Sequence, residues 1–188
     1  MPNIIGVDEV GMGCLAGPVV VCAVIAPSIY KIGDFGVRDS KQLTATKREE
    51  VIKKLKKLNI NYKISLCYPK TIDKLNIYRA SRLAMKKAVL GLAQNLEIFV
   101  DGPRKIPNLD LPQRAITKGD QKIFAIAAAS ILAKAYRDRM MTRYAKRFPQ
   151  YGFERHKGYG TKFHVTMLTQ HGPCILHRIS FAPVGQMI

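Results

Sequence analysis

The sequence predicts a single α/β domain over residues 1–188, in which helices flank a mixed β-sheet. Three observations support this prediction. Strand-type and helix-type periodicities alternate along the chain in an order typical of α/β proteins. A chain of 188 residues, 47% of them hydrophobic, is large enough to bury one core. No internal repeat, low-complexity tract or linker divides the sequence.

The first half of the chain predicts a β-hairpin followed by a helix, a third strand and a second helix. The expected strands span 4–8, 18–25 and 61–68, and the expected helices span 44–58 and 77–92. Thr46 and Glu49 fit a capping box at the start of the first helix. The second strand is apolar throughout, which places it inside the sheet rather than at an exposed edge.

The second half predicts two short strands and then a long helix. The strands are expected at 97–101, which ends in Asp-Gly, and at 114–117. The long helix lies within 121–147, and its centre, 125–133, is too small and apolar to face water on any side. It is therefore expected to be the central helix of the fold. A shorter helix at 161–170 follows in a tail that is otherwise irregular.

The charge balance predicts a polyanionic partner. The chain has 31 lysines and arginines against 13 acids, a net charge of +18, which is typical of proteins that bind nucleic acid. The longest apolar run, 19–26, is too short to span a membrane, and the N-terminus lacks the features of a signal peptide. The four cysteines form no C-x-x-C pair. We therefore expect reduced thiols, a cytoplasmic location, no membrane partner and a monomer.

Four acids stand where strands end and where the long helix begins. Asp8 and Glu9 close the first strand, Asp101 closes a later one, and Asp120 begins the helix. Such ends can converge at one edge of a sheet, and clustered oxygen ligands suit Mg²⁺ or Mn²⁺. The chemistry implied is two-metal hydrolysis of a phosphodiester. Alternatively, each acid is a cap, a turn residue or an ion-pair partner, and the residues alone leave both interpretations open.

Two details of this region constrain the interpretation. The strand period of two directs Asp8 and Glu9 to opposite faces, so Glu9 is expected at the strand end or on a bulge. The segment from Gly11 to Ala16 fits the G-x-G-x-x-A pattern of dinucleotide-binding sites. A strand rather than a helix follows it, which argues against a nucleotide cofactor.

The segment 6–18, GVDEVGMGCLAGP, resembles the opening motif of the ribonuclease HII family, the type 2 ribonucleases H. Further blocks resemble that family in the same order along nearly the whole chain. They are DSKQL (39–43), VDG (100–102), KGD (118–120), AAASILAK (127–134) with Arg137 and Asp138, YGF (151–153) with HKGY (156–159), and HR (177–178) with Ser180 and Phe181.

The resemblance implies a ribonuclease H-like fold and metal-dependent cleavage of the RNA strand of RNA/DNA hybrids. It also implies cleavage at ribonucleotides embedded in duplex DNA, leaving 3′-hydroxyl and 5′-phosphate ends. It marks four metal ligands, which also serve as the catalytic residues and hold two Mg²⁺ or Mn²⁺ ions when substrate is bound: Asp8, Glu9, Asp101 and Asp120. It marks six substrate contacts: Gly11, Met12 and Gly13 toward the ribose 2′-hydroxyl, Ser40 and Lys41 toward phosphate, and Tyr159 toward the sugar at the RNA–DNA junction.

Two alternatives and one departure accompany this resemblance. The sister family, ribonuclease HIII, shares the fold and chemistry but usually carries an extra N-terminal domain, whereas here Asp8 is the eighth residue. A non-catalytic basic protein that coats nucleic acid would explain the charge but not the placed acids. The departure is Met12, because the ribonuclease HII family has arginine between the two glycines.

Overall fold

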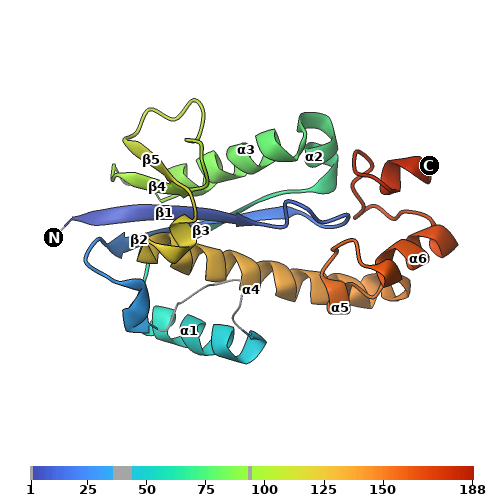
Figure 1. The fold of residues 1–188 in the computed structure, drawn as a ribbon, viewed down its shortest axis with the longest axis horizontal. Helices are drawn as coiled ribbons and strands as arrows, with labels where there is room; N and C mark the ends of the chain where they lie inside the picture. Colours follow the sequence, from blue (N-terminus) through green and yellow to red (C-terminus); the bar gives the residue numbers. More distant parts are fainter. Residues whose placement is uncertain (1, 36–43, 93–94) are drawn as a thin grey trace.

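The computed structural model describes residues 2–35, 44–92 and 95–188, and its centre is a five-stranded mixed sheet (Figure 1). The strand order is β3-β2-β1-β4-β5. The antiparallel part pairs β1 with β2 and β2 with β3, and the parallel part pairs β1 with β4 and β4 with β5. The strands are β1 (Asn3–Val10), β2 (Val19–Pro27), β3 (Tyr62–Cys67), β4 (Ile98–Asp101) and β5 (Gln113–Ile116). The predicted mixed sheet is therefore confirmed.

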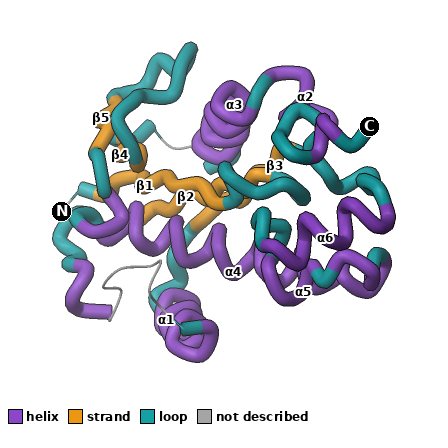
Figure 2. Tube along the Cα trace, turned by 45° about the vertical axis from the view of Figure 1, so that its right-hand side comes forward, coloured by secondary structure: helices purple, strands orange, loops and turns teal. Residues whose placement is uncertain are grey.

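Helices cover both faces of the sheet. The α-helices are α1 (Ala45–Lys57), α2 (Pro69–Leu75), α3 (Ile77–Leu90), α4 (Phe124–Arg147), α5 (Phe153–His156) and α6 (Lys162–His171). Short 3-10 turns are η1 (Ile32–Phe35), η2 (Gly119–Gln121), η3 (Pro149–Tyr151) and η4 (Val184–Gln186). Figures 1 and 2 show α2 and α3 on one face, and α4 on the other with α1 outside it. None of the helices in the described ranges is both long and apolar enough to cross a membrane.

The alternation of side chains along β2 builds two cores, one on each face of the sheet. Val20 and Cys22 pack with the apolar residues of α4, whereas Val19 and Val21 pack with those of α3. Close contact between α4 and β1 depends on Gly6, because a Cβ atom there would lie 2.2 Å from the backbone of Ala125. The buried centre of α4 was predicted correctly, and this contact sets the helix directly against the strand that carries Asp8.

The C-terminal segment, residues 148–188, forms a third core with the second half of α4 and the loop that joins β1 to β2. Its apolar members include Leu15 from the loop, Met141 from α4, and Tyr151 and Phe153 from the segment itself. The backbone N–H of Leu15 donates to the carbonyl of Gly158 at 2.8 Å. Residues distant in sequence are therefore joined beside the C-terminal end of β1.

Two local expectations were wrong, and one helix was missed. The N-cap of α1 is Thr44, whose side chain accepts from the N–H of Lys47, so Thr46 lies inside the helix and makes no capping box. Asp120 does not begin the long helix, because it lies in η2 and α4 starts at Phe124. Helix α2 was not predicted, since seven residues are too few for a clear apolar period.

Candidate active site

A cleft of about 450 Å³ opens at the carboxyl ends of β1 and β4. Three of the four predicted ligands line it, namely Asp8, Glu9 and Asp101. The predicted substrate contacts Gly11, Met12, Gly13 and Tyr159 line it as well. Ser40 and Lys41 lie outside the described residues. The structure thus brings together, in one cleft, acids and substrate-contact candidates that are up to 151 positions apart, from Asp8 to Tyr159.

Asp8 and Glu9 share this cleft because β1 extends beyond its parallel neighbour. The last residue of β1 that pairs with β4 is Val7, opposite Val100. On the other side the register with β2 continues regularly, with Glu9 opposite Val21, so β1 has no bulge there. Glu9 lies one residue before the strand end at Val10. Both carboxylates therefore stand at an open edge of the sheet although they alternate in direction.

The Asp8 carboxyl is buried, with 3% of the residue exposed. Burial, and then the negative charges of Glu9 and Asp101, raise the pKa of Asp8 well above its usual range, while a hydrogen bond with the Ser130 side chain acts in the opposite direction. Ser130 comes from the centre of α4, which Gly6 allows to approach β1. The three acids of the cleft therefore interact electrostatically.

Asp120 adjoins the cleft without lining it. The backbone N–H of Gly119 donates to Asp101 Oδ1 at 2.7 Å, and this bond fixes η2 against the end of β4. A Cβ atom at position 119 would lie 2.6 Å from Ile126 Cδ1, so a larger residue there would displace that side chain. Asp120 itself is 1% exposed. Over residues 2–35, 44–92 and 95–188, no three His, Cys, Asp or Glu side chains already form a group that could hold a metal ion.

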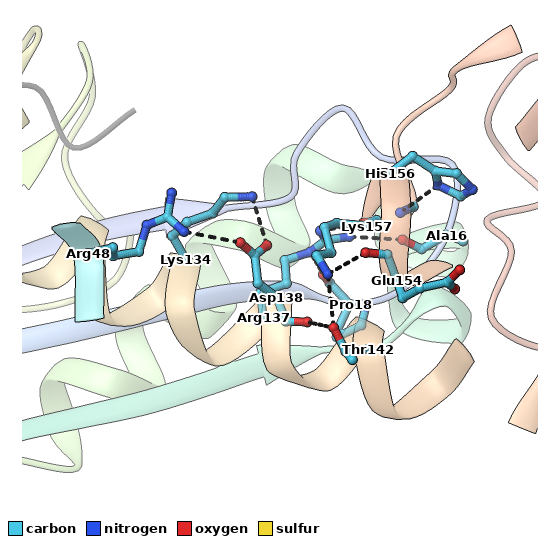
Figure 3. A network of polar contacts seen from close by, with 11 residues as sticks. Ala16, Pro18, Arg48, Lys134, Arg137, Asp138, Thr142, Glu154, His156 and Lys157 are labelled. Atoms are coloured by element: carbon cyan, nitrogen blue, oxygen red, sulfur yellow. Dashed lines mark hydrogen bonds and ion pairs between the residues drawn. The ribbon is translucent and has the colours of Figure 1, made fainter. Parts of the chain in front are cut away.

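Two buried arginines, Arg137 and Arg178, hold the loop that joins β1 to β2, residues 11–18, which we call the glycine loop. Arg178 donates to the carbonyl of Gly11 at 2.7 Å, of Met12 at 2.8 Å, and of Gly17 at 2.9 Å. Arg137 donates to the carbonyls of Ala16 and Pro18, and to that of Lys157 at 2.7 Å (Figure 3). Burial lowers the pKa of Arg178 to about 10, so the guanidinium stays charged at neutral pH.

Gly11 and Gly13 of this loop have different roles. Gly11 has a φ of +91°, and a Cβ atom there would lie 2.3 Å from Arg137 Nε, so the residue must be glycine. A Cβ atom on Gly13 would meet nothing within 4 Å. The backbone at Gly13 is therefore open to a bound molecule.

Tyr159 lines the same cleft as the acids, and the residue is partly exposed. Lys134 Nζ is 5.7 Å from the ring centroid, and Arg137 Cζ is 5.9 Å from it. Lys134 also pairs with Asp138 at 2.7 Å, and Arg48 reaches the same carboxylate at 3.4 Å (Figure 3). Asp138 is thus a structural ion-pair partner, placed away from the predicted ligands.

A chain of hydrogen bonds through two buried histidines fixes the backbone of Tyr159. His177 Nδ1 accepts from the N–H of Cys174, so its Nε2 carries the proton and donates to His164 Nε2 at 3.0 Å. His164 Nδ1 then donates to the carbonyl of Tyr159 at 2.9 Å. This pattern requires both rings to be neutral. Burial lowers the pKa of each to about 4, which agrees with that assignment.

Sequence reasoning did not assign roles to four residues that build this site: Ser130, Lys134, Arg137 and Arg178. Lys134 directly follows the small apolar run of α4 and Arg137 lies one turn further on, and these charges beside such a run were the available signal. Nothing in the sequence near Arg178 indicates that its partners lie in residues 11–17.

The family model for ribonuclease HII matches residues 5–184. The chain belongs to the ribonuclease HII family. Ribonuclease HII from Caldicellulosiruptor saccharolyticus is 48% identical over 178 residues, which cover 95% of this chain and 86% of the relative. Ribonuclease HII from Neisseria meningitidis serogroup C is 46% identical, covering 97% of this chain and 94% of the relative. This family membership makes the chain a ribonuclease H endonuclease rather than a non-catalytic nucleic-acid-binding protein.

Solved structures agree with the fold. Ribonuclease H2 from Pyrococcus horikoshii has a TM-score of 0.82 at 26% identity, covering 98% of this chain and 96% of that one. The ribonuclease HII of Archaeoglobus fulgidus, solved in complex with PCNA, has a TM-score of 0.81 at 26% identity and covers 95% and 94%. A ribonuclease HIII structure, at 21% identity and a TM-score of 0.78, has the same fold, but the match covers 69% of its chain. The family match therefore favours ribonuclease HII over the sister family.

Proposed function

We propose that this endonuclease uses Mg²⁺ or Mn²⁺ to cleave the RNA strand of RNA/DNA hybrids and to cut at ribonucleotides embedded in duplex DNA. The products would carry 3′-hydroxyl and 5′-phosphate ends. The observation that carries the proposal is the cleft in which Asp8, Glu9 and Asp101 meet, in a chain whose net charge is +18. Lysines and arginines attract the polyanion, and the acidic cleft is where metal ions would meet it.

The donor set of the cleft fits hard divalent cations. All the predicted ligands are carboxylates, which are the ligands that Mg²⁺ and Mn²⁺ prefer. The raised pKa of Asp8 reflects burial and repulsion from two neighbouring acids, and a bound cation would relieve that repulsion. Asp8, Glu9, Asp101 and Asp120 would hold the ions, which when bound supply activation of the attacking water and stabilisation of the departing 3′ oxygen.

The loop and Tyr159 would select the ribonucleotide. The carbonyls of Gly11 and Met12 are held by Arg178, which fixes the loop's backbone in place at the rim of the cleft. Such a backbone can approach a 2′-hydroxyl, the group that distinguishes RNA from DNA. Tyr159 lines the same cleft and is partly exposed, so its ring could pack on the next sugar. Lys134, which lines the cleft, contributes positive charge beside the bound strand.

Ser40 and Lys41, as predicted from the sequence, would contact phosphate. We also propose that the protein acts as a monomer in the cytoplasm, in the repair of DNA that contains ribonucleotides. Its four cysteines are free thiols, three of them buried, which suits a reducing compartment.

The test is cleavage of a labelled DNA duplex that contains one ribonucleotide, with an all-DNA duplex as control. We expect a single cut at the ribonucleotide in Mg²⁺ or Mn²⁺, none in EDTA and none in the control. An RNA/DNA hybrid should be cut at several positions on the RNA strand. Equal cleavage of the all-DNA duplex, or cleavage that persists in EDTA, would contradict the proposal.

A further inference from the structure

A second cavity, of about 260 Å³, lies between α3 and the loop that connects β4 to β5. Three basic residues of α3 line it, namely Arg79, Arg82 and Lys86, together with Tyr78. Lys86 Nζ donates to the carbonyl of Asn108, which ties the loop to the helix beside the cavity. No acidic side chain is part of the lining among the described residues. The cavity is therefore strongly positive.

Arg82 is the unusual member of this group, because it is buried and does not use all of its N–H donors in hydrogen bonds. It is 6% exposed, and its Nη1 donates to the carbonyl of Arg104 and to Met85 Sδ, both at 3.1 Å. Its Nε is buried and makes no hydrogen bond, and no carboxylate in the described ranges pairs with its guanidinium. A buried charge without a counterion is costly, so an anion is the natural complement.

The contrast with the other buried arginines supports a binding role. Arg137 and Arg178 each donate to several backbone carbonyls and thereby hold a loop. Arg82 has one such carbonyl, that of Arg104. A guanidinium carries five N–H donors in a planar fork that matches phosphate oxygens. The geometry of Arg82 thus leaves more of its donors for a ligand.

Tyr78 adds an aromatic surface at the same place. The residue is 38% exposed, with Arg82 Cζ at 5.2 Å and Arg104 Cζ at 5.5 Å from its ring centroid. An exposed aromatic ring among guanidinium groups is typical of surfaces that bind a nucleic-acid backbone and stack on its sugars or bases. The chemistry of the cavity therefore favours a phosphate group attached to a nucleotide chain.

The cavity also approaches the active site. A Cβ atom on Gly102 would have Arg82 Nη2 as its neighbour at 3.9 Å, and Gly102 directly follows Asp101. We propose that this cavity binds a backbone phosphate of the nucleic-acid substrate outside the cleavage site. The inference rests on the proposed function, since it assigns a further contact to the same substrate.

The experiment measures duplex binding over a series of salt concentrations in EDTA, so that it does not depend on cleavage. Two duplexes carry the same central ribonucleotide, one of them short and the other extended on both sides. Arg82→Met removes the buried charge while keeping the volume. Arg79→Gln, at an exposed position of the same cavity, gives a second variant that does not disturb buried packing. Lys87→Met, an exposed lysine of α3 outside the cavity lining, is the matched control.

We expect both cavity variants to bind the long duplex about 3- to 10-fold more weakly than the wild type, with a log-log salt slope lower by about 0.9. Their affinity for the short duplex, and their cleavage of it in Mg²⁺ or Mn²⁺, should match the wild type, as should the control on both duplexes. Unchanged binding of the long duplex by both variants would overturn the proposal. Equal losses on both duplexes would also overturn it.

A separate titration distinguishes a strand phosphate from free phosphate. If inorganic phosphate raises the melting temperature of the wild type but not of Arg82→Met, while duplex binding is the same in both, the cavity is a site for free phosphate and the proposal is wrong. Failure of the wild type to cleave a ribonucleotide-containing duplex would contradict the proposed function instead. The binding measurement would still decide the role of Arg82.

Discussion

Two parts of the cleft lining, the acids and the glycine loop with Tyr159, are held in place by different interactions. Asp8 lies near the end of β1 and Asp101 ends β4. Both strands contain buried apolar residues, and α4 packs on β1 through Gly6. The glycine loop and Tyr159, by contrast, depend on hydrogen bonds from Arg137, Arg178 and His164. This difference implies that a substitution can disrupt the proposed metal ligands without disrupting the proposed substrate contacts, and the reverse. Mutations should therefore fall into two classes with different readouts.

The largest effect is expected from Asp101→Asn. It removes a proposed metal ligand but keeps an oxygen that can accept from the N–H of Gly119, so the fold should persist. We expect turnover to fall by several orders of magnitude, while duplex affinity stays equal or rises because a negative charge is removed. Single-turnover cleavage and binding in EDTA measure the two quantities. In the absence of metal the melting temperature should rise, because repulsion with Asp8 is relieved.

The control for this prediction is Asp110→Asn, the same substitution at an exposed acid of the β4–β5 loop. It should leave turnover unchanged. Near wild-type turnover of Asp101→Asn at saturating metal would show that Asp101 is not a ligand.

The next largest effect is expected at the glycine loop, from Arg178→Met. The substitution leaves the carbonyls of Gly11, Met12 and Gly17 without their buried donor. We expect the free energy of unfolding to fall by about 3–5 kcal/mol, as for other broken buried charge networks. Urea denaturation measures this, with the exposed Arg155→Met as control.

Where Arg178→Met still folds, the comparison predicts a specific defect. The loop loses its position, so discrimination between a ribonucleotide and a deoxyribonucleotide at the cleavage site should weaken, whereas the acids remain in place. A variant as stable and as selective as the wild type would contradict the assignment of Arg178 as the support of the loop.

The same contrast explains how much could be predicted from the sequence. Apolar periodicity predicted the strands that carry Asp8 and Asp101, because the residues that a strand buries form a pattern within its own short sequence. Parallel pairing of β1 with β4 then places their carboxyl ends together. The burial of Arg178 was not predictable, because its partners lie more than 160 positions away and an arginine is ordinarily exposed.

Local conformation caused the remaining error at the site. Ile123, the N-cap of α4, has an extended backbone conformation, with φ of −123° and ψ of 120°, which separates η2 from α4. Asp120 therefore belongs to a turn of its own, although an acid ahead of a helical pattern favours an N-terminal position. Isoleucine is a poor N-cap residue, so the sequence carried no signal that the helix begins after Ile123.

A smaller effect concerns acid stability, through the histidine pair. Since the pKa values of His164 and His177 are lowered by burial to about 4, the unfolded chain binds their protons first as the pH falls. The free energy of unfolding is therefore at its full value above pH 7 and falls between about pH 6.5 and 4. Protonation of one of the two histidines lowers it by about 3 kcal/mol. Urea unfolding at several pH values measures this loss.

The matched variants are His177→Gln, which breaks the buried hydrogen bonds through His164 and His177, and His171→Gln, which changes an exposed histidine. His177→Gln should be less stable than the wild type at pH 7.5, and the difference should shrink as the pH falls to 4.5. His171→Gln should follow the wild type throughout. If the difference in unfolding free energy between His177→Gln and the wild type stays constant with pH, His164 and His177 are not a neutral pair joined by a hydrogen bond.

The smallest effect is expected at Met12, where the family has arginine. The Met12 carbonyl is held by Arg178 whatever the side chain is, so Met12→Arg should keep the loop in place and add one charge at the rim of the cleft. We expect tighter duplex binding, a log-log salt slope steeper by about one phosphate contact, and a greater preference for a single embedded ribonucleotide over a continuous hybrid. Met12→Gln, which adds a polar group without charge, is the control and should leave the slope unchanged. Binding isotherms at several salt concentrations, with cleavage rates on both substrates, measure these effects. If Lys134 or another basic residue already neutralises that phosphate, neither the slope nor the rate ratio of Met12→Arg will change, and the loop's side chain then has no part in reading the junction.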